Sequence, residues 1–256
     1  MNDLYRHDTQ VSSHDLLKIL ALSTIIIDHV GKYFFIDSVW WRVVGRMAAP
    51  QFFFLVGYSE SYKFKSQILF YGLALCVVNY LTNPSTSIVE HILPINMLIG
   101  FVLIKALLNR FDPAKLPAEF LMLLLAVLML LSLPTYILIE YGTLAFCYAI
   151  GARLVRQRHG FRYFWIIATV VVHFFFELVI VLIRNLDVSI SLQLLPAAIA
   201  LLAVVFGANL IIFLNYDFRV FKAGPKFIRT LAIYISRYYL QIYFFHLAAF
   251  MIIYYI

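Results

Sequence analysis

Apolar runs of near membrane-spanning length recur along the whole chain and are separated by short polar segments. A transmembrane helix needs about 20 mostly apolar residues, and only helices or closed barrels satisfy the backbone within lipid. The pattern therefore predicts an all-α, polytopic integral membrane protein with about nine transmembrane helices. We place them at about 15–36, 43–61, 67–82, 92–109, 117–133, 136–154, 163–183, 189–214 and 229–255.

Composition and charge agree with this pattern. The chain of 256 residues is 64% hydrophobic and only 13% charged, whereas soluble domains contain about 25% charged residues. If the polar lead at 1–14 is cytoplasmic, most of the 20 lysines and arginines fall in alternate loops on that side. This predicts an N-in/C-out topology. Because topology explains the net charge of +7, no nucleic-acid partner is expected. Asp15 is expected to cap the first helix.

Few residues suit metal or nucleotide chemistry. Cys76 and Cys147, the two cysteines, lie in apolar segments and form neither a disulfide framework nor a zinc cluster. The chain has no HExxH pattern, no phosphate-binding Walker loop, no dinucleotide-binding glycine fingerprint and no G-x-S-x-G elbow. We therefore expect no metal site.

Asp28 and His29 interrupt the first apolar run. A charged group at membrane depth costs roughly 2.5 kcal/mol or more, so such residues usually serve function. Neighbours on a helix point about 100° apart, so the two cannot both line one narrow seam. In one interpretation Asp28 pairs with Lys32 or Arg46 and ties helices together. In the other, His29 is a general base, and Asp28 reaches it through another group or instead holds Arg46. The spacing leaves these alternatives open.

Other polar residues also lie within predicted membrane-spanning segments. Arg46 stays charged and needs an anionic or carbonyl partner, so it either clamps a phosphate or oxyanion or extends to the membrane surface. His246, deep in the last span, is either a packing residue or a participant in chemistry. His173 and Glu177 are four residues apart on one helical face and can satisfy each other.

Several of these residues form an ordered pattern. It begins with Lys18-x-x-Ala21-x(6)-Asp28-His29 and Gly45-Arg46-x-Ala48-x-Pro50-x-Phe52. It continues with Asn96 and the following Leu-Ile-Gly-Phe, then Glu140-Tyr141-Gly142, and ends with Tyr243-Phe-Phe-His246-Leu. From residue 16 to the C-terminus this pattern resembles the TraX family, the membrane N-acetyltransferases linked to conjugative pilin. That family is similar to the wider class of transmembrane acyltransferases.

The resemblance implies a function. Residues 15–256 would form a single transmembrane acyltransferase-like domain in the bacterial cytoplasmic (inner) membrane. It would take an acetyl group from cytosolic acetyl-CoA. The acceptor would be an amine or hydroxyl of a pilin-like protein, a glycan or a lipid, and homo-oligomers would be compatible with this activity. By the same resemblance the catalytic residues are His29 as base, Asp28 as its support, Arg46 at the substrate or transition state, and His246 as a second cavity histidine. The residues expected to bind the coenzyme are Arg46, Asn96, Tyr243 and Lys18.

Two other classes of function compete with this hypothesis. A proton-coupled transporter or flippase would use Asp28 and His29 as a relay, with His173 and Glu177. Inverted repeats would favour a transporter, but the hydropathy pattern contains none. A non-catalytic assembly factor for a surface structure would tolerate loss of His29.

Overall fold

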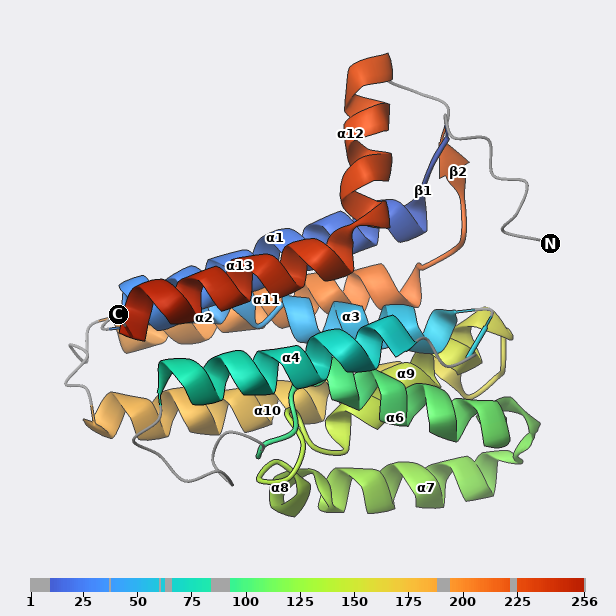
Figure 1. Cartoon of the computed structure of the whole chain (residues 1–256). Helices are drawn as coiled ribbons and strands as arrows, with labels where there is room; N and C mark the ends of the chain where they lie inside the picture. The colour runs from blue at the N-terminus through green and yellow to red at the C-terminus, as the bar shows by residue number, and fades with distance from the viewer. Residues whose placement is uncertain are drawn as a thin grey trace.

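The fold is a bundle of helices, seen in a computed structural model that describes residues 10–36, 38–59, 61–62, 66–83, 93–187, 194–221 and 225–255, with side chains omitted at 181–187. The predicted all-α class is confirmed (Figure 1). The described helices are α1 (Ser13–Phe34), α2 (Val39–Gly45), α3 (Ala48–Tyr58), α4 (Ser66–Thr82), α6 (Met97–Arg110), η2 (Pro113–Lys115), α7 (Ala118–Leu130), α8 (Ser132–Thr135), α9 (Leu144–Arg156), α10 (Arg162–Asp187), α11 (Leu195–Leu214), α12 (Lys226–Arg237) and α13 (Tyr239–Tyr255). Two short strands, β1 (Val11–Ser12) and β2 (Val220–Phe221), pair antiparallel.

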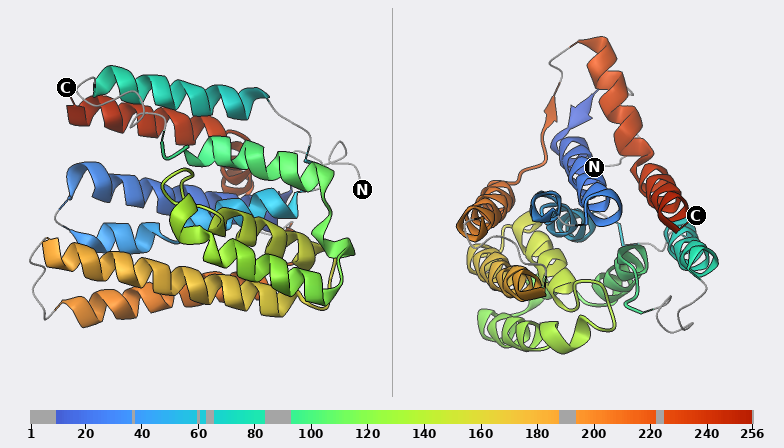
Figure 2. Two further views of the ribbon diagram at one scale, coloured as in Figure 1. Left: turned by 90° about the horizontal axis from the view of Figure 1, so that it is seen from below. Right: turned by 90° about the vertical axis from the view of Figure 1, so that its left-hand side faces the viewer.

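Helices α3 and α9 form the centre of the bundle, as the view along the helix axes shows (Figure 2, right). Nearly every residue of these two helices is buried. Gly57 makes their close approach possible, because a Cβ there would lie 1.9 Å from the carbonyl oxygen of Ala149. Small residues at such a contact allow two helix backbones to pack closely in a membrane.

Helix α1 packs against the central helix α3 and contains part of the candidate site. It packs against α2, α3 and α13, while α13 also packs against α4. Helices α10 and α11 pair on another side and cover α9 and α2. The result brings residues from both ends of the chain to one region.

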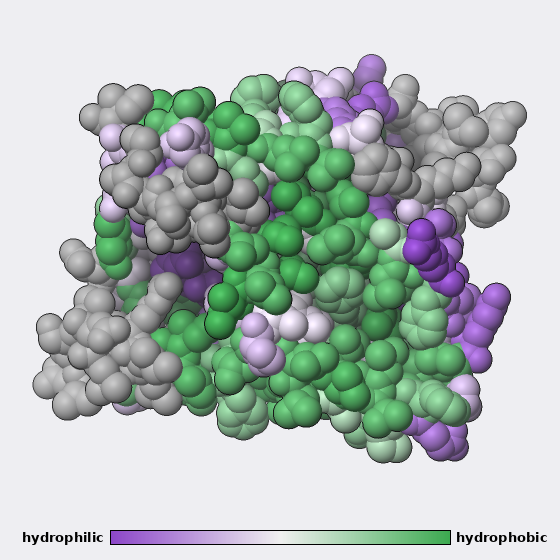
Figure 3. All heavy atoms as spheres, turned by 60° about the horizontal axis from the view of Figure 1, so that its bottom comes forward, coloured by the Kyte–Doolittle hydropathy of each residue, from purple (hydrophilic) through white to green (hydrophobic). Residues whose placement is uncertain are grey.

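Two described helices are long and apolar enough to cross a membrane, namely α10 over Arg162–Ile180 and α11. A third is obtained if α12 and α13 are counted as one bent span. Figure 3 shows a broad apolar surface, with hydrophilic residues at its right-hand end and smaller groups of them at the left and the top, as expected for a membrane protein. The nine spans and the N-in/C-out orientation stay predictions.

Three predicted spans differ from the observed helices. The run 43–61 is divided by a turn at Arg46 and Met47, which separates α2 from α3. Pro50 sits in the first turn of α3, where a missing backbone N–H is tolerated. The run 136–154 becomes helical only at α9, because the chain turns at Tyr141 and Gly142, whose φ angles are 68° and 52°.

The run 229–255 is bent by 70° between α12 and α13. At the other end of the chain, Ser12 rather than Asp15 is the N-cap of α1. Asp15 is the third residue of a capping box and accepts the backbone N–H of Ser12 at 2.8 Å. Predicting Asp15 as the cap itself was therefore wrong by one turn.

Candidate functional site

Two histidines from opposite ends of the chain form a pair between α1 and α13. Nδ1 of His29 lies 2.8 Å from Nε2 of His246, and their rings stack with centroids 5.0 Å apart. Nδ1 of His246 lies 2.9 Å from the carbonyl oxygen of Ile242, which can only accept a hydrogen bond. In the neutral pair His246 therefore donates from Nδ1 and accepts at Nε2 from His29. The lone pair of His29 is then on Nε2, which is available as a base.

Aromatic side chains surround this pair. The rings of Tyr33 and Tyr243 lie 6.5 and 6.0 Å from the His29 ring, and Phe250 lies 5.6 Å from His246. His29 is only 8% exposed. Tyr243, which we expected to bind the coenzyme, thus forms part of the wall around the pair. Such a wall limits water and strengthens electrostatic interactions inside it.

Asp28 faces Arg42 of α2. The Arg42 guanidinium forms an ion pair with Oδ2 of Asp28 and donates to the Asp28 backbone carbonyl at 3.3 Å. Gly45 makes room, because a Cβ there would lie 2.2 Å from the Asp28 Cβ. Oδ1 of Asp28 is buried and has no described hydrogen-bond partner.

This pairing differs from both sequence-based interpretations. We expected Asp28 to support His29 or to pair with Lys32 or Arg46, whereas the structure pairs it with Arg42 and places His246 at Nδ1 of His29. Sequence reasoning missed Arg42. It precedes Arg46 by four residues, a spacing that puts both cations on one helical face.

Arg46 begins a buried chain of polar groups. Its Nε lies 3.2 Å from Oε2 of Glu177, and its Nη1 donates to the Tyr141 hydroxyl at 3.4 Å. The other carboxylate oxygen of Glu177 lies 3.6 Å from Nε2 of His173. Nδ1 of His173 lies 3.0 Å from the Tyr148 hydroxyl. The predicted His173–Glu177 pair therefore extends to Arg46 on one side and Tyr148 on the other.

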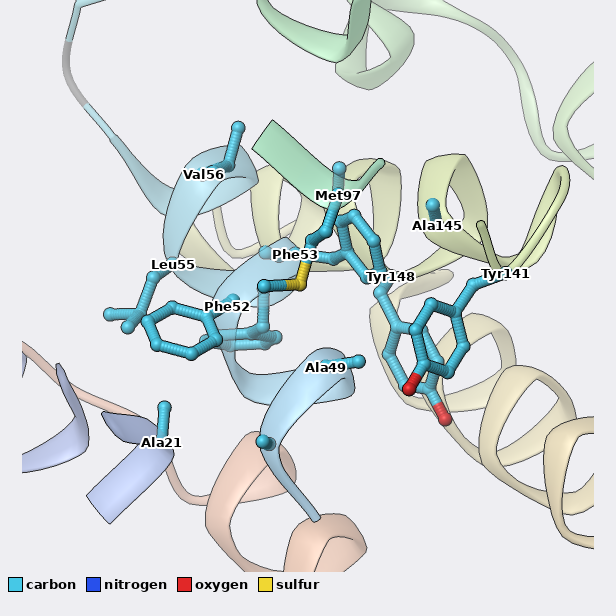
Figure 4. Close-up of a cluster of buried hydrophobic side chains, with 14 of the residues drawn as sticks. Ala21, Ala49, Phe52, Phe53, Leu55, Val56, Met97, Tyr141, Ala145 and Tyr148 are labelled. Carbon is cyan, nitrogen blue, oxygen red and sulfur yellow. The ribbon is translucent and has the colours of Figure 1, made fainter. Parts of the chain in front are cut away.

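Tyr141 reaches this chain from an unusual backbone position. Its φ of 68° is in the left-handed region, which costs a bulky residue roughly 1–3 kcal/mol and often marks functional sites. Figure 4 shows the hydroxyl ends of Tyr141 and Tyr148 side by side and pointing the same way. The turn before α9 thus fixes a tyrosine hydroxyl beside Arg46.

The surrounding charges balance. Glu140 interacts electrostatically with Lys32, and its Oε2 accepts the backbone N–H of Met97 at 2.8 Å. Charges of opposite sign in one region reduce the cost of holding them inside apolar surroundings. The described cluster contains three cations and three carboxylates: Lys32, Arg42, Arg46, Asp28, Glu140 and Glu177.

Two residues that we expected to bind the coenzyme, Lys18 and Asn96, make contacts elsewhere in the structure. Lys18 lies 11 positions before His29 in α1, about 16 Å along the helix. Its Nζ is 5.0 Å from the ring centroid of Tyr239. Asn96 caps α6, accepting from the N–H of Ile99 at 3.2 Å, and donates to the Gly72 carbonyl at 2.8 Å. Coenzyme binding by Lys18 and Asn96 stays a prediction.

A cavity of about 190 Å³ lies between α4 and α6. It carries Lys105 and Arg110, and the guanidinium of Arg153 stacks 5.4 Å from the Tyr62 ring in its wall. The cavity is lined by Tyr62, Ile68, Val102, Lys105, Ala106, Asn109 and Arg110.

Among the described residues, no group of three or more His, Cys, Asp and Glu side chains could hold a metal ion.

Comparison with protein families gives a match over nearly the whole chain. The family model described as TraX protein matches residues 13–254. An uncharacterised protein of Rickettsia prowazekii (strain Madrid E), RP591, is 32% identical over 131 residues, or 51% of this chain and 50% of the relative. The match thus spans about half the length of that curated relative. No solved structure matches the chain.

Proposed function

The chain belongs to the TraX family, and on that premise we propose that it is a membrane-embedded acetyltransferase. The donor is cytosolic acetyl-CoA, and the acceptor is an amine or hydroxyl of a pilin-like protein, a glycan or a lipid. The His29–His246 pair is the observation that carries this proposal. It supplies a base nitrogen with a fixed orientation inside an aromatic enclosure.

The reaction needs one proton acceptor and stabilisation of one oxyanion. Nε2 of His29 removes the proton from the acceptor as its nitrogen or oxygen attacks the thioester carbonyl carbon. The resulting tetrahedral oxyanion collapses, and the carbon–sulfur bond breaks. The leaving thiolate takes the proton from His29. The products are the acetylated acceptor and free coenzyme A.

His246 positions the base. When His29 becomes protonated, its Nδ1–H continues to donate to Nε2 of His246, which orients the ring and stabilises the imidazolium. His246 is itself oriented by the carbonyl of Ile242. General-base catalysis of this kind contributes typically 10²–10⁴-fold to a rate.

Arg46 is our candidate for the oxyanion. Its described contacts, an ion pair with Glu177 through Nε and a hydrogen bond to Tyr141 through Nη1, leave donors of Nη1 and Nη2 for other partners. The remaining donors can face a developing negative charge, and one such preorganised donor is worth about 10²–10³ in rate. Glu177 and Tyr141 would keep the guanidinium plane in place.

The cavity between α4 and α6 is our candidate site for the phosphates of the coenzyme. Its lining contains Lys105 and Arg110 but no carboxylate. It lies toward the end of α6 that we predict to be cytoplasmic. Lys105 is eight residues from Met97, which contacts Glu140 of the charge cluster. That separation is about 12 Å along the helix, a distance that an extended pantetheine arm can cover. Loss of Arg110 should therefore raise the KM for acetyl-CoA and leave kcat unchanged.

The test is acetyl-CoA binding and thioester turnover by the purified protein in detergent. Wild type and His29→Ala should both bind, and only wild type should release coenzyme A when an acceptor amine is supplied. His159→Ala is the matched control, because that histidine lies in the turn before α10 and its Nδ1 accepts the Phe161 N–H at 3.1 Å. Absence of acetyl-CoA binding by wild type would refute the proposal.

A proton-coupled transporter is the second candidate. The chain from Arg46 through Glu177 and His173 to Tyr148 favours it, since linked buried titratable groups can pass protons. A transporter in proteoliposomes would acidify or alkalinise the lumen in response to a substrate gradient. An acetyltransferase would release coenzyme A without such a proton flux.

A further inference from the structure

Helix α12 projects away from the rest of the bundle (Figure 1). It meets α13 at an angle of 70°, with the break at Tyr238. If α13 crosses the bilayer along its normal, α12 lies within about 20° of the membrane plane. A helix in that orientation runs along the membrane surface and does not continue the span.

Helix α12 packs against β1 and α1 at the end of the bundle where α1 begins, and a hydrogen bond joins it to α1. The Ser236 hydroxyl donates to Oδ1 of Asp15 at 2.5 Å. Asp15 also closes the capping box at the start of α1. In α12, which the structure describes in full, only Ser236 is buried. Arg229, Ala232, Ile233 and Ile235 are half-buried, and the other residues of the helix are exposed.

The exposed surface of α12 is divided into two faces. Phe227, Leu231, Tyr234 and Tyr238 follow the helical spacing of one face, and their side chains are exposed, Phe227 to 75%. We call these four residues the apolar stripe. Lys226, Thr230 and Arg237 are also exposed, and they form a polar face beside the stripe. Arg229 is half-buried, and the helix contains no carboxylate.

We infer that α12 is an interfacial helix on the cytoplasmic leaflet, with its apolar stripe among the acyl chains and the exposed Lys226 and Arg237 at anionic lipid headgroups. Amphipathic helices of this composition lie in the interface with the apolar face buried. Basic residues are attracted to the negative surface of the cytoplasmic leaflet. The neighbouring segment at 219–229 belongs to the loops that the charge pattern predicts to be cytoplasmic. This inference depends on membrane location and is independent of acetyl transfer.

The orientation can be measured with spin labels in the full chain, reconstituted into bilayer nanodiscs with anionic lipid. The background is Cys76→Ala, because Cys147 is fully buried and out of reach of the label. Labels at Phe227→Cys and Leu231→Cys report the apolar stripe, and labels at Lys226→Cys and Thr230→Cys report the polar face. A label at Phe245→Cys in α13, which is exposed to 63%, is the control for a lipid-facing span.

The expected result is an alternation between faces. Labels on the apolar stripe should collide with oxygen more than with a water-soluble nickel chelate, and this preference should reverse at Lys226 and Thr230. Equal exposure of all four labels to the nickel chelate would overturn the inference, since the helix would then stand in water. Oxygen preference at all four positions, matching Phe245, would indicate one continuous span. Shielding of the stripe from both reagents would indicate a protein partner.

The headgroup part has its own test. The stripe labels should lie deeper in phosphatidylglycerol-containing nanodiscs than in phosphatidylcholine alone. Lys226→Glu should reduce that difference, whereas the control Lys115→Glu, in η2, should preserve it. Equal depth in the two lipids would refute the claim that anionic headgroups attract the basic residues of α12.

Discussion

Nδ1 of His29 lies 2.8 Å from Nε2 of His246, although 217 positions separate the two residues in the chain. The first and last described long helices meet to form this contact. In many enzymes the group that accepts a hydrogen bond from a histidine base is a carboxylate. Here that group is a histidine, which in its neutral form adds no charge to the cluster around it. This arrangement suits a base that must be uncharged before it acts.

Replacing His246 tests its positioning role. His246→Ala removes the acceptor for the His29 Nδ1–H, so kcat for acetyl transfer should fall by roughly tenfold or more, which is a part of the 10²–10⁴-fold contribution of general-base catalysis. His246→Gln keeps a side-chain acceptor and should recover part of the rate. The pH profile of kcat/KM should shift in His246→Ala, because the stabilisation of protonated His29 is lost. An unchanged profile with a lowered rate would indicate a structural role alone.

Arg46 is tested by its most conservative replacement. Arg46→Lys keeps the charge but cannot contact Glu177 and Tyr141 with one planar group. We expect the rate of acetyl transfer to fall by about 10²-fold, as for loss of one oxyanion donor. Arg219→Lys is the comparison, because that arginine pairs with Asp217 at the exposed surface, away from the histidines and the cavity. Full activity of Arg46→Lys would argue against the proposed role.

Substitution by alanine should have opposite effects on stability at Gly57, which lies at the contact between α3 and α9, and at Gly207 in α11. Gly57→Ala places a Cβ 1.9 Å from the Ala149 carbonyl oxygen and should cost about 1–3 kcal/mol of stability through overpacking. Gly207→Ala in α11 meets nothing within 4 Å and should stabilise by up to about 1 kcal/mol, because alanine favours helix. Thermal unfolding in one detergent compares both variants. Similar melting temperatures would show that the two helices separate more easily than the structure indicates.

Asp112, in the connection before η2, predicts a pH effect. Burial alone would raise the pKa of Asp112, but the hydrogen bond from Arg153, with a separation of 3.2 Å, holds it below its usual range. A lowered folded pKa adds stability that is present above the unfolded value, near pH 4, and is lost as pH falls through the folded pKa. Asp112→Asn should therefore destabilise by about 0.2–1 kcal/mol at pH 7 and match wild type in strong acid.

The control for this pH effect is Glu119→Gln, a change at an exposed carboxylate in the first turn of α7. Its melting temperature should follow that of wild type at every pH. If Asp112→Asn differs from wild type equally at pH 7 and in acid, the contribution of Asp112 does not depend on its charge.

Most helices could be predicted from local sequence. Long apolar runs correspond to α4, α10 and α11, because hydrophobicity and length need no knowledge of neighbours. The bend before Tyr239 was missed, since average hydrophobicity over 229–255 conceals the spacing that sets one face of α12 apart. That spacing was the available signal. The positive φ at Tyr141 had a weaker signal in the following glycine.

The sequence by itself determined which polar residues are costly at depth, because an ionisable group within an apolar run needs a partner wherever the helix packs. Asp28, His29 and Arg46 could be selected on that ground. Only the tertiary structure decided the partners, namely Arg42 for Asp28, His246 for His29 and Glu177 for Arg46. The physical reason is that these pairs depend on how each helix is rotated and which helix it meets. Packing across the whole bundle decides both.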